Sequence, residues 1–241
     1  MQILAIGNSF SEDATRYLHA IARADGVKLD VANLYIGGCT LERHYRNLLS
    51  EQAVYGLQYN GETSGFFVSL KEALLNRKWD VITLQQASPV SFKSESYFPY
   101  ITELATFIRR CQPAAKLYLH QTWAYEQNSN MLFHTAKYES SQAMLRDVVA
   151  AYEKAATTVR ADGMIRSGEL LGRLTDQGIS PLYRDGFHAS LGVGRYALGL
   201  MWYRTLVQCD VLGNSFSDFD IPISKDDVQT VKTCVEAFWS E

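Results

Sequence analysis

The chain has 241 residues, of which 47% are hydrophobic and 20% charged, and its formal net charge is −3. This composition is typical of a globular protein, and we expect a single domain over residues 1–241. No run of lysine and arginine occurs, which argues against a nucleic-acid partner. The 4 cysteines are scattered without a C-x-x-C pair, which argues against a zinc site or a disulfide framework.

No apolar run approaches the roughly 20 residues of a membrane span, so we expect no membrane insertion. The first residues enter a strand without a basic region or an apolar signal segment. We therefore expect a cytoplasmic protein as the chain stands, and a periplasmic or secreted one if a signal peptide has been removed. The sequence leaves the oligomeric state open.

Short apolar runs and helical periodicities alternate along the chain. The apolar runs predict strands over 1–6, 27–36, 79–84, 115–119 and 163–166. The periodicities predict helices over 14–24, 41–49, 70–76, 98–111, 137–160, 191–207 and 226–239, and one more that ends near 174. This alternation favours parallel βαβ units, so we expect a three-layer α/β/α sandwich around a mostly parallel sheet.

Residues 53–68 break this alternation. Tyr55, Leu57 and Tyr59 alternate with other residues before Asn60-Gly61, the strongest short signal for a β-hairpin. We expect a hairpin excursion here. As a hypothesis, it covers the rim of the sheet beside the loop after the second strand and shapes specificity.

In a parallel sheet, ligands bind beyond the carboxyl ends of the strands. The residues that follow the predicted strands should therefore meet on one rim. These residues are Asn8-Ser9, Gly37-Gly38, Gln85-Gln86 and Gln121-Thr122-Trp123.

Ser9 lies in a polar turn between the first strand and a helical segment. The strand would hold the serine rigidly. The unpaired backbone N–H groups at the start of the helix favour negative charge, so chemistry that develops an anion can take place there. A structural interpretation is also open, because Ser9-Phe10-Ser11-Glu12 has the spacing of a capping box. In that case the Ser9 side chain only caps the helix.

Asp185 and His188 are three residues apart near the other end of the chain. On a loop, this spacing lets a carboxylate hold an imidazole that points into a site. The alternative is an Asp-Gly turn with an incidental histidine. Neither interpretation is decided by this segment alone.

The serine turn and the Asp-x-x-His segment together resemble the SGNH (GDSL-like) hydrolase superfamily. Gly7-Asn8-Ser9-Phe10-Ser11 stands where that family has Gly-Asp-Ser-Leu-Ser, and Gly37-Gly38-Cys39-Thr40 matches its second block. Asp185-Gly186-Phe187-His188 matches the last block. More narrowly, the chain resembles the DUF4886 branch, through the stretches 79–88, 121–125 and 184–188 as well.

The resemblance implies a flavodoxin-like sheet and a serine esterase that needs no cofactor. Ser9 would be the nucleophile, His188 the general base and Asp185 the residue that orients it. The backbone N–H groups of Ser9 and Gly38 would form an oxyanion hole. The implied reaction is hydrolysis of an acyl ester, an acetyl ester first of all, on a carbohydrate or another small molecule, through an acyl-enzyme.

One block departs from the family pattern. The superfamily has Gly-x-Asn-Asp after the third strand, whereas this chain has Gln85 and Gln86. A glutamine amide can donate the same hydrogen bond to an oxyanion, and related sugar O-acetyl esterases have a glutamine near this point. The sequence does not decide whether Gln85 or Gln86 points into the site. It also leaves open the alternative that both glutamines only satisfy loop backbone groups.

Three residues near the fourth strand end are candidates for substrate binding: Trp123, Tyr125 and, beside them, Gln121. The two aromatic rings would form a sugar-stacking wall, although core packing is an equal alternative.

His120 and His134 have no third ligand at a suitable spacing, so we expect no metal site. Two other functions stay open, a catalytically silent SGNH-fold protein that binds carbohydrate and a short-chain lipase or thioesterase.

Overall fold

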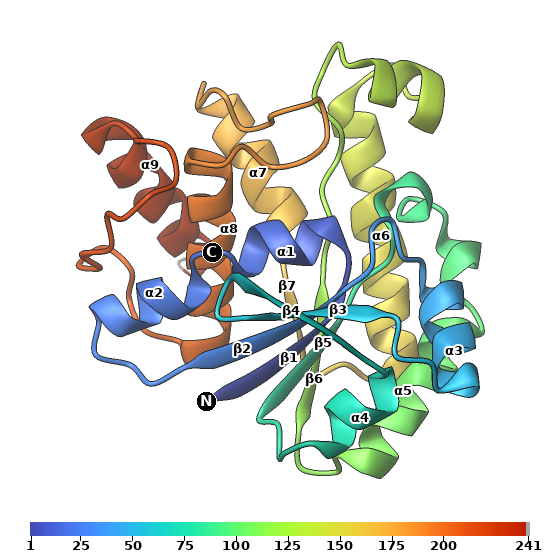
Figure 1. Ribbon diagram of the computed structural model, residues 1–241. Coiled ribbons are helices and arrows are strands. Elements are labelled where there is room, and N and C mark those ends of the chain that lie inside the picture. The colour runs from blue at the N-terminus through green and yellow to red at the C-terminus, as the bar shows by residue number, and fades with distance from the viewer. Residues whose placement is uncertain (240–241) are drawn as a thin grey trace.

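A mixed sheet forms the centre of the molecule. The computed structural model describes residues 1–239, and residues 240 and 241 of the predicted domain lie outside them. Within these residues, seven strands follow the order β4-β3-β2-β1-β5-β6-β7 (Figure 1). Their bounds are β1 Gln2–Gly7, β2 Asp30–Tyr35, β3 Tyr55–Tyr59, β4 Glu62–Val68, β5 Val81–Leu84, β6 Lys116–His120 and β7 Gly163–Ile165.

Strands β2, β1, β5, β6 and β7 are parallel, whereas β3 and β4 are antiparallel additions at one edge. The order of the parallel strands is the flavodoxin-like one, so the predicted fold class is confirmed. β1 lies at the centre, and the side chains from Ile3 to Ile6 are at most 1% exposed. Burial on both faces explains why this strand reads as a continuous apolar run.

Helices cover both faces of the sheet. Their bounds are α1 Ser9–Thr15, α2 Leu18–Ala24, α3 Leu41–Ser50, α4 Leu70–Leu75, α5 Tyr100–Cys111, α6 Ser141–Val159, α7 Ser167–Asp176, α8 Val193–Val207 and α9 Lys225–Ala237. In Figure 1, α2, α8 and α9 lie on the left of the sheet and α3 to α6 on the right. None of the helices within residues 1–239 is both long and apolar enough to span a bilayer.

Two predicted helices differ from the structure. The helix expected over 14–24 is two helices, because the chain turns at Arg16, whose guanidinium reaches the carboxylate of Asp220 at 2.6 Å and the carbonyl of Gly61 at 3.2 Å. The helix expected over 137–160 begins only at Ser141. A π-helical turn over Met131–Ala136 precedes it and ends at a left-handed residue, Lys137.

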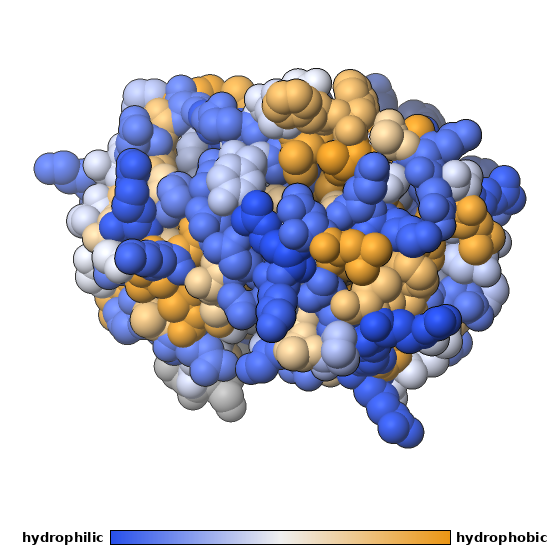
Figure 2. Space-filling model, turned by 60° about the horizontal axis from the view of Figure 1, so that its bottom comes forward, coloured by the Kyte–Doolittle hydropathy of each residue, from blue (hydrophilic) through white to orange (hydrophobic). Residues whose placement is uncertain are grey.

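The turn between β3 and β4 is made by Asn60 and Gly61. Both have positive φ angles, 52° and 85°, as the two central residues of a type I′ hairpin turn require. β4 is an edge strand of the sheet, and Phe66 and Phe67 on it are 70% and 67% exposed. On the face shown in Figure 2, hydrophobic residues form separate patches between hydrophilic ones.

Candidate active site

The turn after β1 leaves the hydroxyl of Ser9 free for chemistry. Asn8, and not Ser9, caps helix α1, because the Asn8 side-chain oxygen accepts a hydrogen bond from the N–H of Phe10 at 3.0 Å. Ser9 is the first residue of the helix and is half-buried. The capping-box interpretation of Ser9 is therefore wrong, since the neighbouring asparagine already does this work.

The structure brings Ser9, His188 and Asp185 together from opposite ends of the chain. The Ser9 hydroxyl lies 2.9 Å from Nε2 of His188, and Nδ1 of His188 lies 2.7 Å from Oδ2 of Asp185. These distances allow the hydroxyl to donate to the ring and the ring N–H to donate to the carboxylate. The His188 side chain is only 19% exposed, while that of Asp185 is 43% exposed.

Asp185 is held as a carboxylate by hydrogen bonds. Its Oδ1 accepts from the backbone N–H groups of His188, at 2.8 Å, and Phe187, at 3.3 Å. Burial by itself raises the pKa of Asp185, but the hydrogen bonds from the His188 side chain and backbone outweigh it and leave the pKa lowered. The group that faces the imidazole is therefore negatively charged at neutral pH.

A buried ionic network joins the loop that carries His188 to helix α1, which carries Ser9. Asp13 lies one turn after Ser9 in α1 and is fully buried. Both of its oxygens accept from Arg184 at 2.9 Å, and Oδ1 also accepts from Arg195 at 2.9 Å. The N–H of Ala189 donates to Oδ2 at 3.2 Å. Because Arg184 and Ala189 flank the Asp185–His188 segment, this network fixes the loop against α1.

The sequence analysis missed Asp13. Asp13 directly precedes the helix expected over 14–24, in a polar segment whose sequence gives no sign of burial. The partner arginines lie more than 170 positions away, so no local pattern identifies them.

The loop after β2 lies against the serine turn. Asn8 donates from Nδ2 to the carbonyl of Cys39 at 3.2 Å, which joins the two turns. Gly38 is exposed and has a φ of +61°, and a side chain there would meet no atom within 4 Å. Among residues 1–239, the backbone N–H groups of Ser9 and Gly38 donate to no other backbone group. Two unused donors therefore lie on this rim.

Gln85 has partners on both ends of its amide. Its Nε2 donates to Oδ1 of Asn8 at 2.6 Å, and its Oε1 lies 2.7 Å from Nδ1 of His120. Burial lowers the pKa of His120 to about 3, so the ring is neutral, and its Nδ1–H donates to Gln85 while Nε2 accepts from the Ser167 hydroxyl at 3.1 Å. Gln85 thus supports Asn8 from below the rim.

Gln86 is used by the loop backbone. Its Oε1 accepts from the N–H groups of Leu41, at 3.0 Å, and Ala87, at 2.9 Å, and its Nε2 donates to the carbonyl of Ser96 at 3.0 Å. Gln85 and Gln86 are 2% and 1% exposed. The prediction that one of them donates to an oxyanion is therefore not met, because burial and these partners engage both amides.

Trp123, Tyr125 and Gln121 are fully buried, so the prediction that they contact substrate is not met either. Trp123 stacks on Phe10 with ring centroids 3.9 Å apart and donates from Nε1 to the carbonyl of Phe187 at 2.7 Å. Trp123 therefore contacts the residues next to Ser9 and next to His188.

The hydroxyl of Tyr125 lies 3.1 Å from that of Ser88, and Gln121 exchanges two hydrogen bonds with Glu169. Both side chains thus satisfy interior partners. Among residues 1–239, no group of three or more histidine, cysteine or acidic side chains is arranged to hold a metal ion. A cavity of about 780 Å³ lies between α6 and α7, and its lining includes none of the three residues Ser9, Asp185 and His188.

Comparisons with known proteins agree with the fold and the family resemblance. The model of a family described as a domain of unknown function, DUF4886, matches residues 2–235. The crystal structure of a DUF4886 family protein from Bacteroides uniformis is 33% identical, with a TM-score of 0.90 over 100% of this chain and 95% of that one. A sequence comparison with curated proteins finds no match.

More distant structures share the fold. A protein from Slackia heliotrinireducens assigned to the SGNH hydrolases is 21% identical, with a TM-score of 0.62 over 86% of this chain and 98% of that one. An acetylxylan esterase from Geobacillus stearothermophilus is 14% identical, with a TM-score of 0.52 over 86% and 92%. The chain therefore belongs to the DUF4886 family and has the fold of the SGNH hydrolases.

Proposed function

We propose that the chain is a serine esterase that hydrolyses an acetyl ester on a carbohydrate, with Ser9, His188 and Asp185 as its catalytic triad. The observation that carries the proposal is the hydrogen-bond relay from the Ser9 hydroxyl to His188 and on to Asp185, at 2.9 and 2.7 Å. An activated nucleophile requires a base within this range and a third group that orients the base.

Acylation follows from this geometry. His188 accepts the proton of Ser9 at Nε2 while Oγ attacks the ester carbonyl carbon, and Asp185 stabilises the imidazolium. The N–H groups of Ser9 and Gly38 donate to the negative oxygen of the tetrahedral intermediate. When the C–O bond breaks, His188 returns its proton to the leaving alcohol, and the acyl group remains on Ser9.

Deacylation repeats these steps with water. His188 takes a proton from a water molecule, whose oxygen attacks the acyl carbon. The acid leaves, and His188 returns the proton to Ser9. Loss of one oxyanion donor typically lowers turnover by about 10²–10³-fold, so two fixed backbone donors are a substantial part of the catalysis.

The carbohydrate part of the proposal is supported by the fold shared with an acetylxylan esterase and by the open rim on which the triad lies. A half-exposed Asp185 and an exposed Gly38 suit a bulky alcohol better than a long acyl chain that needs an enclosed apolar pocket. A GDSL-like lipase from Parabacteroides merdae shares the fold as well, with a TM-score of 0.57, so the open rim and not the fold favours the carbohydrate ester over a lipid ester.

The first test is the intact mass of the protein after treatment with a fluorophosphonate, which reacts with activated serines. We expect one adduct on the wild type, none on Ser9→Ala, and one on Ser64→Ala, an exposed serine on β4. Turnover of p-nitrophenyl acetate and acetate release from acetylated xylo-oligosaccharides then test the ester. Saturable binding of the oligosaccharide by folded wild type that forms no adduct would replace the proposal with a catalytically silent binding protein.

A further inference from the structure

A row of three residues crosses the β2–β3–β4 edge of the sheet beside the oxyanion loop. Tyr35 of β2 pairs with Gly56 of β3, which pairs with Phe67 of β4. Residues directly opposite one another in a sheet carry their side chains on the same face. We propose that these three residues form an aromatic platform that binds the sugar ring of the ester, an inference that rests on the esterase function proposed above.

The adjacent row shows which way Phe67 points. Tyr55 pairs with Val68, and Tyr55 is fully buried with its hydroxyl 2.9 Å from Nδ1 of His44 in α3. Successive side chains of a strand alternate between faces, so Phe67 points to the opposite side from α3. The pairing of β3 with β4 is irregular between Gly56 and Gln58, and Phe66 is the residue of this stretch next to Phe67. Alternation from Phe67 places the Phe66 side chain on the side of Val68. The two exposed phenylalanines therefore lie on different faces of the hairpin.

The face of Phe67 is the one that carries the nucleophile's helix. Asn33, two residues before Tyr35 in β2, accepts a hydrogen bond from the hydroxyl of Ser11 in α1 at 2.7 Å. Tyr35 points to the same side because the side-chain period of a strand is two. Burial, followed by the negative charge of Glu12 in the same helix, raises the pKa of Tyr35, as expected for a hydroxyl close to α1.

The residue between Tyr35 and Phe67 in this row is Gly56, which has no side chain; we call this position the floor of the platform. A Cβ at Gly56 would lie at ordinary contact distance from Tyr35, at 3.6 and 3.9 Å, and would meet no atom of Phe67 within 4 Å, so there is room above Gly56. Strands are about 4.8 Å apart, which separates the backbones of Tyr35 and Phe67 by about 10 Å. The C–H face of a sugar ring packs on aromatic surface of this kind, and Phe67 is 67% exposed.

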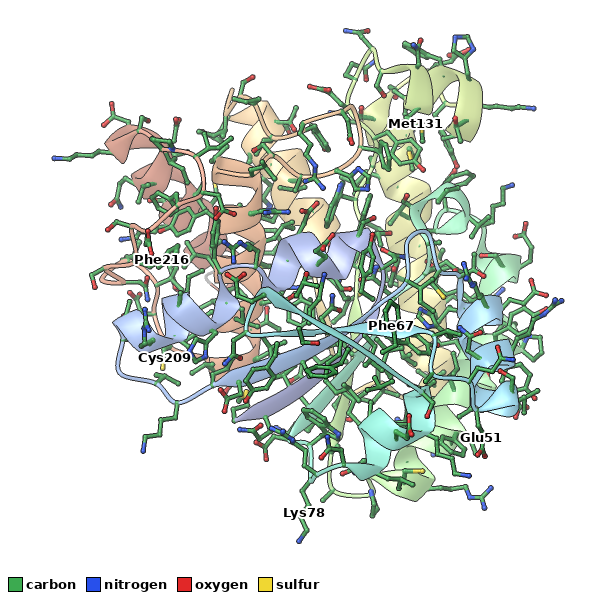
Figure 3. All side chains as sticks on the ribbon, in the orientation of Figure 1. Glu51, Phe67, Lys78, Met131, Cys209 and Phe216 are labelled. Carbon is green, nitrogen blue, oxygen red and sulfur yellow. The ribbon has the colours of Figure 1, made fainter. Side chains whose placement is uncertain are left out.

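One polar group is available at the same place. Among residues 1–239, the hydroxyl of Tyr35 has no hydrogen-bond partner, and it lies 3.5 Å from the position of a Cβ on Gly37. Gly37 directly precedes the oxyanion donor Gly38. An ester whose carbonyl oxygen is held at Gly38 therefore lies next to Tyr35, and in the proposal its alcohol portion extends over the platform. Figure 3 labels Phe67 below α1, in front of the sheet.

A second copy of this chain is the competing occupant, because β4 is an edge strand. The positions of the phenylalanines favour the sugar. Strand pairing along β4 would use Phe66 and Phe67 alike, whereas only Phe67 lies on the face that continues to the oxyanion loop.

The experiment compares two substrates in matched variants. Phe67→Ala is the test, Phe66→Ala is the control with the same residue type and similar exposure, and Gly56→Leu fills the floor without removing an aromatic ring. The readout is kcat/KM for an acetylated xylo-oligosaccharide divided by kcat/KM for ethyl acetate, whose alcohol has no ring to pack on the platform. We expect this ratio to fall about 10-fold in Phe67→Ala and Gly56→Leu, mainly through KM, and to stay constant in Phe66→Ala.

Each other outcome has one meaning. An unchanged ratio in Phe67→Ala, or an equal fall in Phe66→Ala, overturns the platform while the esterase function stands. A wild type that forms no fluorophosphonate adduct and hydrolyses neither ester refutes the esterase function. In that case the platform is tested by calorimetry, which compares oligosaccharide binding to Ser9→Ala with binding to the double variant Ser9→Ala, Phe67→Ala. Equal affinities would overturn the platform. A dimer in solution that Phe66→Ala and Phe67→Ala both dissociate assigns the edge to a second copy and overturns the platform.

Discussion

Replacing Asp13 by asparagine should lower both stability and turnover. The substitution keeps the size of the side chain but removes the charge that faces Arg184 and Arg195. Breaking one partner of a buried ion pair costs about 3–5 kcal/mol. The two arginine side chains are 28% and 14% exposed, so water partly compensates them, and we expect a loss near the lower limit, about 3 kcal/mol.

The effect on turnover has a separate cause. Without Asp13, the loop with His188 loses its bonds through Arg184 and the N–H of Ala189. A displacement of a catalytic group by about 1 Å can cost about 10²-fold in rate, so we expect a fall in kcat of this order. Urea denaturation followed by circular dichroism measures the stability, and p-nitrophenyl acetate measures kcat under conditions in which the variant is fully folded.

The matched control is Glu62→Gln, which removes a carboxylate from an ion pair with Arg16 that is 75% exposed at Glu62. Exposed pairs contribute at most about 1 kcal/mol, so this variant should stay close to the wild type. Equal stability losses in the two variants would refute the reasoning about the buried network. A large stability loss in Asp13→Asn with wild-type kcat would show that the network holds the fold without positioning His188.

Other substitutions test separate contacts. Asp185→Asn should lower kcat by about 10⁴-fold, because the acceptor that fixes the His188 tautomer is lost, and a wild-type kcat would contradict the triad. The fold lowers the pKa of Asp185 from 3.8, so its stabilising effect is complete above that pH and lost as the pH falls through the folded value. Thermal unfolding from pH 6 to 2.5 should therefore show a steeper acid loss in the wild type than in Asp185→Asn, and parallel curves would exclude the effect. Trp123→Phe keeps the stack on Phe10 but leaves the carbonyl of Phe187 without its donor, which should cost about 1–3 kcal/mol in urea denaturation, and a change below 0.5 kcal/mol would argue against that bond.

The sequence predicts the sheet and the proximity of Ser9, Asp185 and His188 for a common reason. Parallel strands end on one edge, so Ser9 after β1 and Gly38 after β2 had to lie close together once the strands were identified. Asp185 and His188 are three residues apart on a loop, and their pairing depends only on local chain geometry. The hydrophobic periodicity and the short spacing of Asp185 and His188 are therefore enough to predict the sheet and which residues lie at its edge.

The roles of Gln85 and Trp123 depend on contacts that no local pattern contains. Gln85 was one of two glutamines expected at the oxyanion because they stand in place of the family's Gly-x-Asn-Asp block, but Asn8 and His120 engage its amide inside the sheet edge. For Trp123, the sequence left open a place on the rim or in the core, and Phe10 and the histidine loop cover it. Both outcomes arise where segments far apart in sequence pack on one another.

The distance along the chain between the proposed nucleophile and its base has a consequence for synthesis of the protein. Ser9 leaves the ribosome 179 positions before His188. At about 5–20 residues per second, a nascent chain carries its serine for roughly 10–35 seconds before the imidazole exists. During this time the hydroxyl has no base to activate it. Under the proposed function, ester turnover thus reports that the chain has been made as far as the loop after α7 and folded back onto β1.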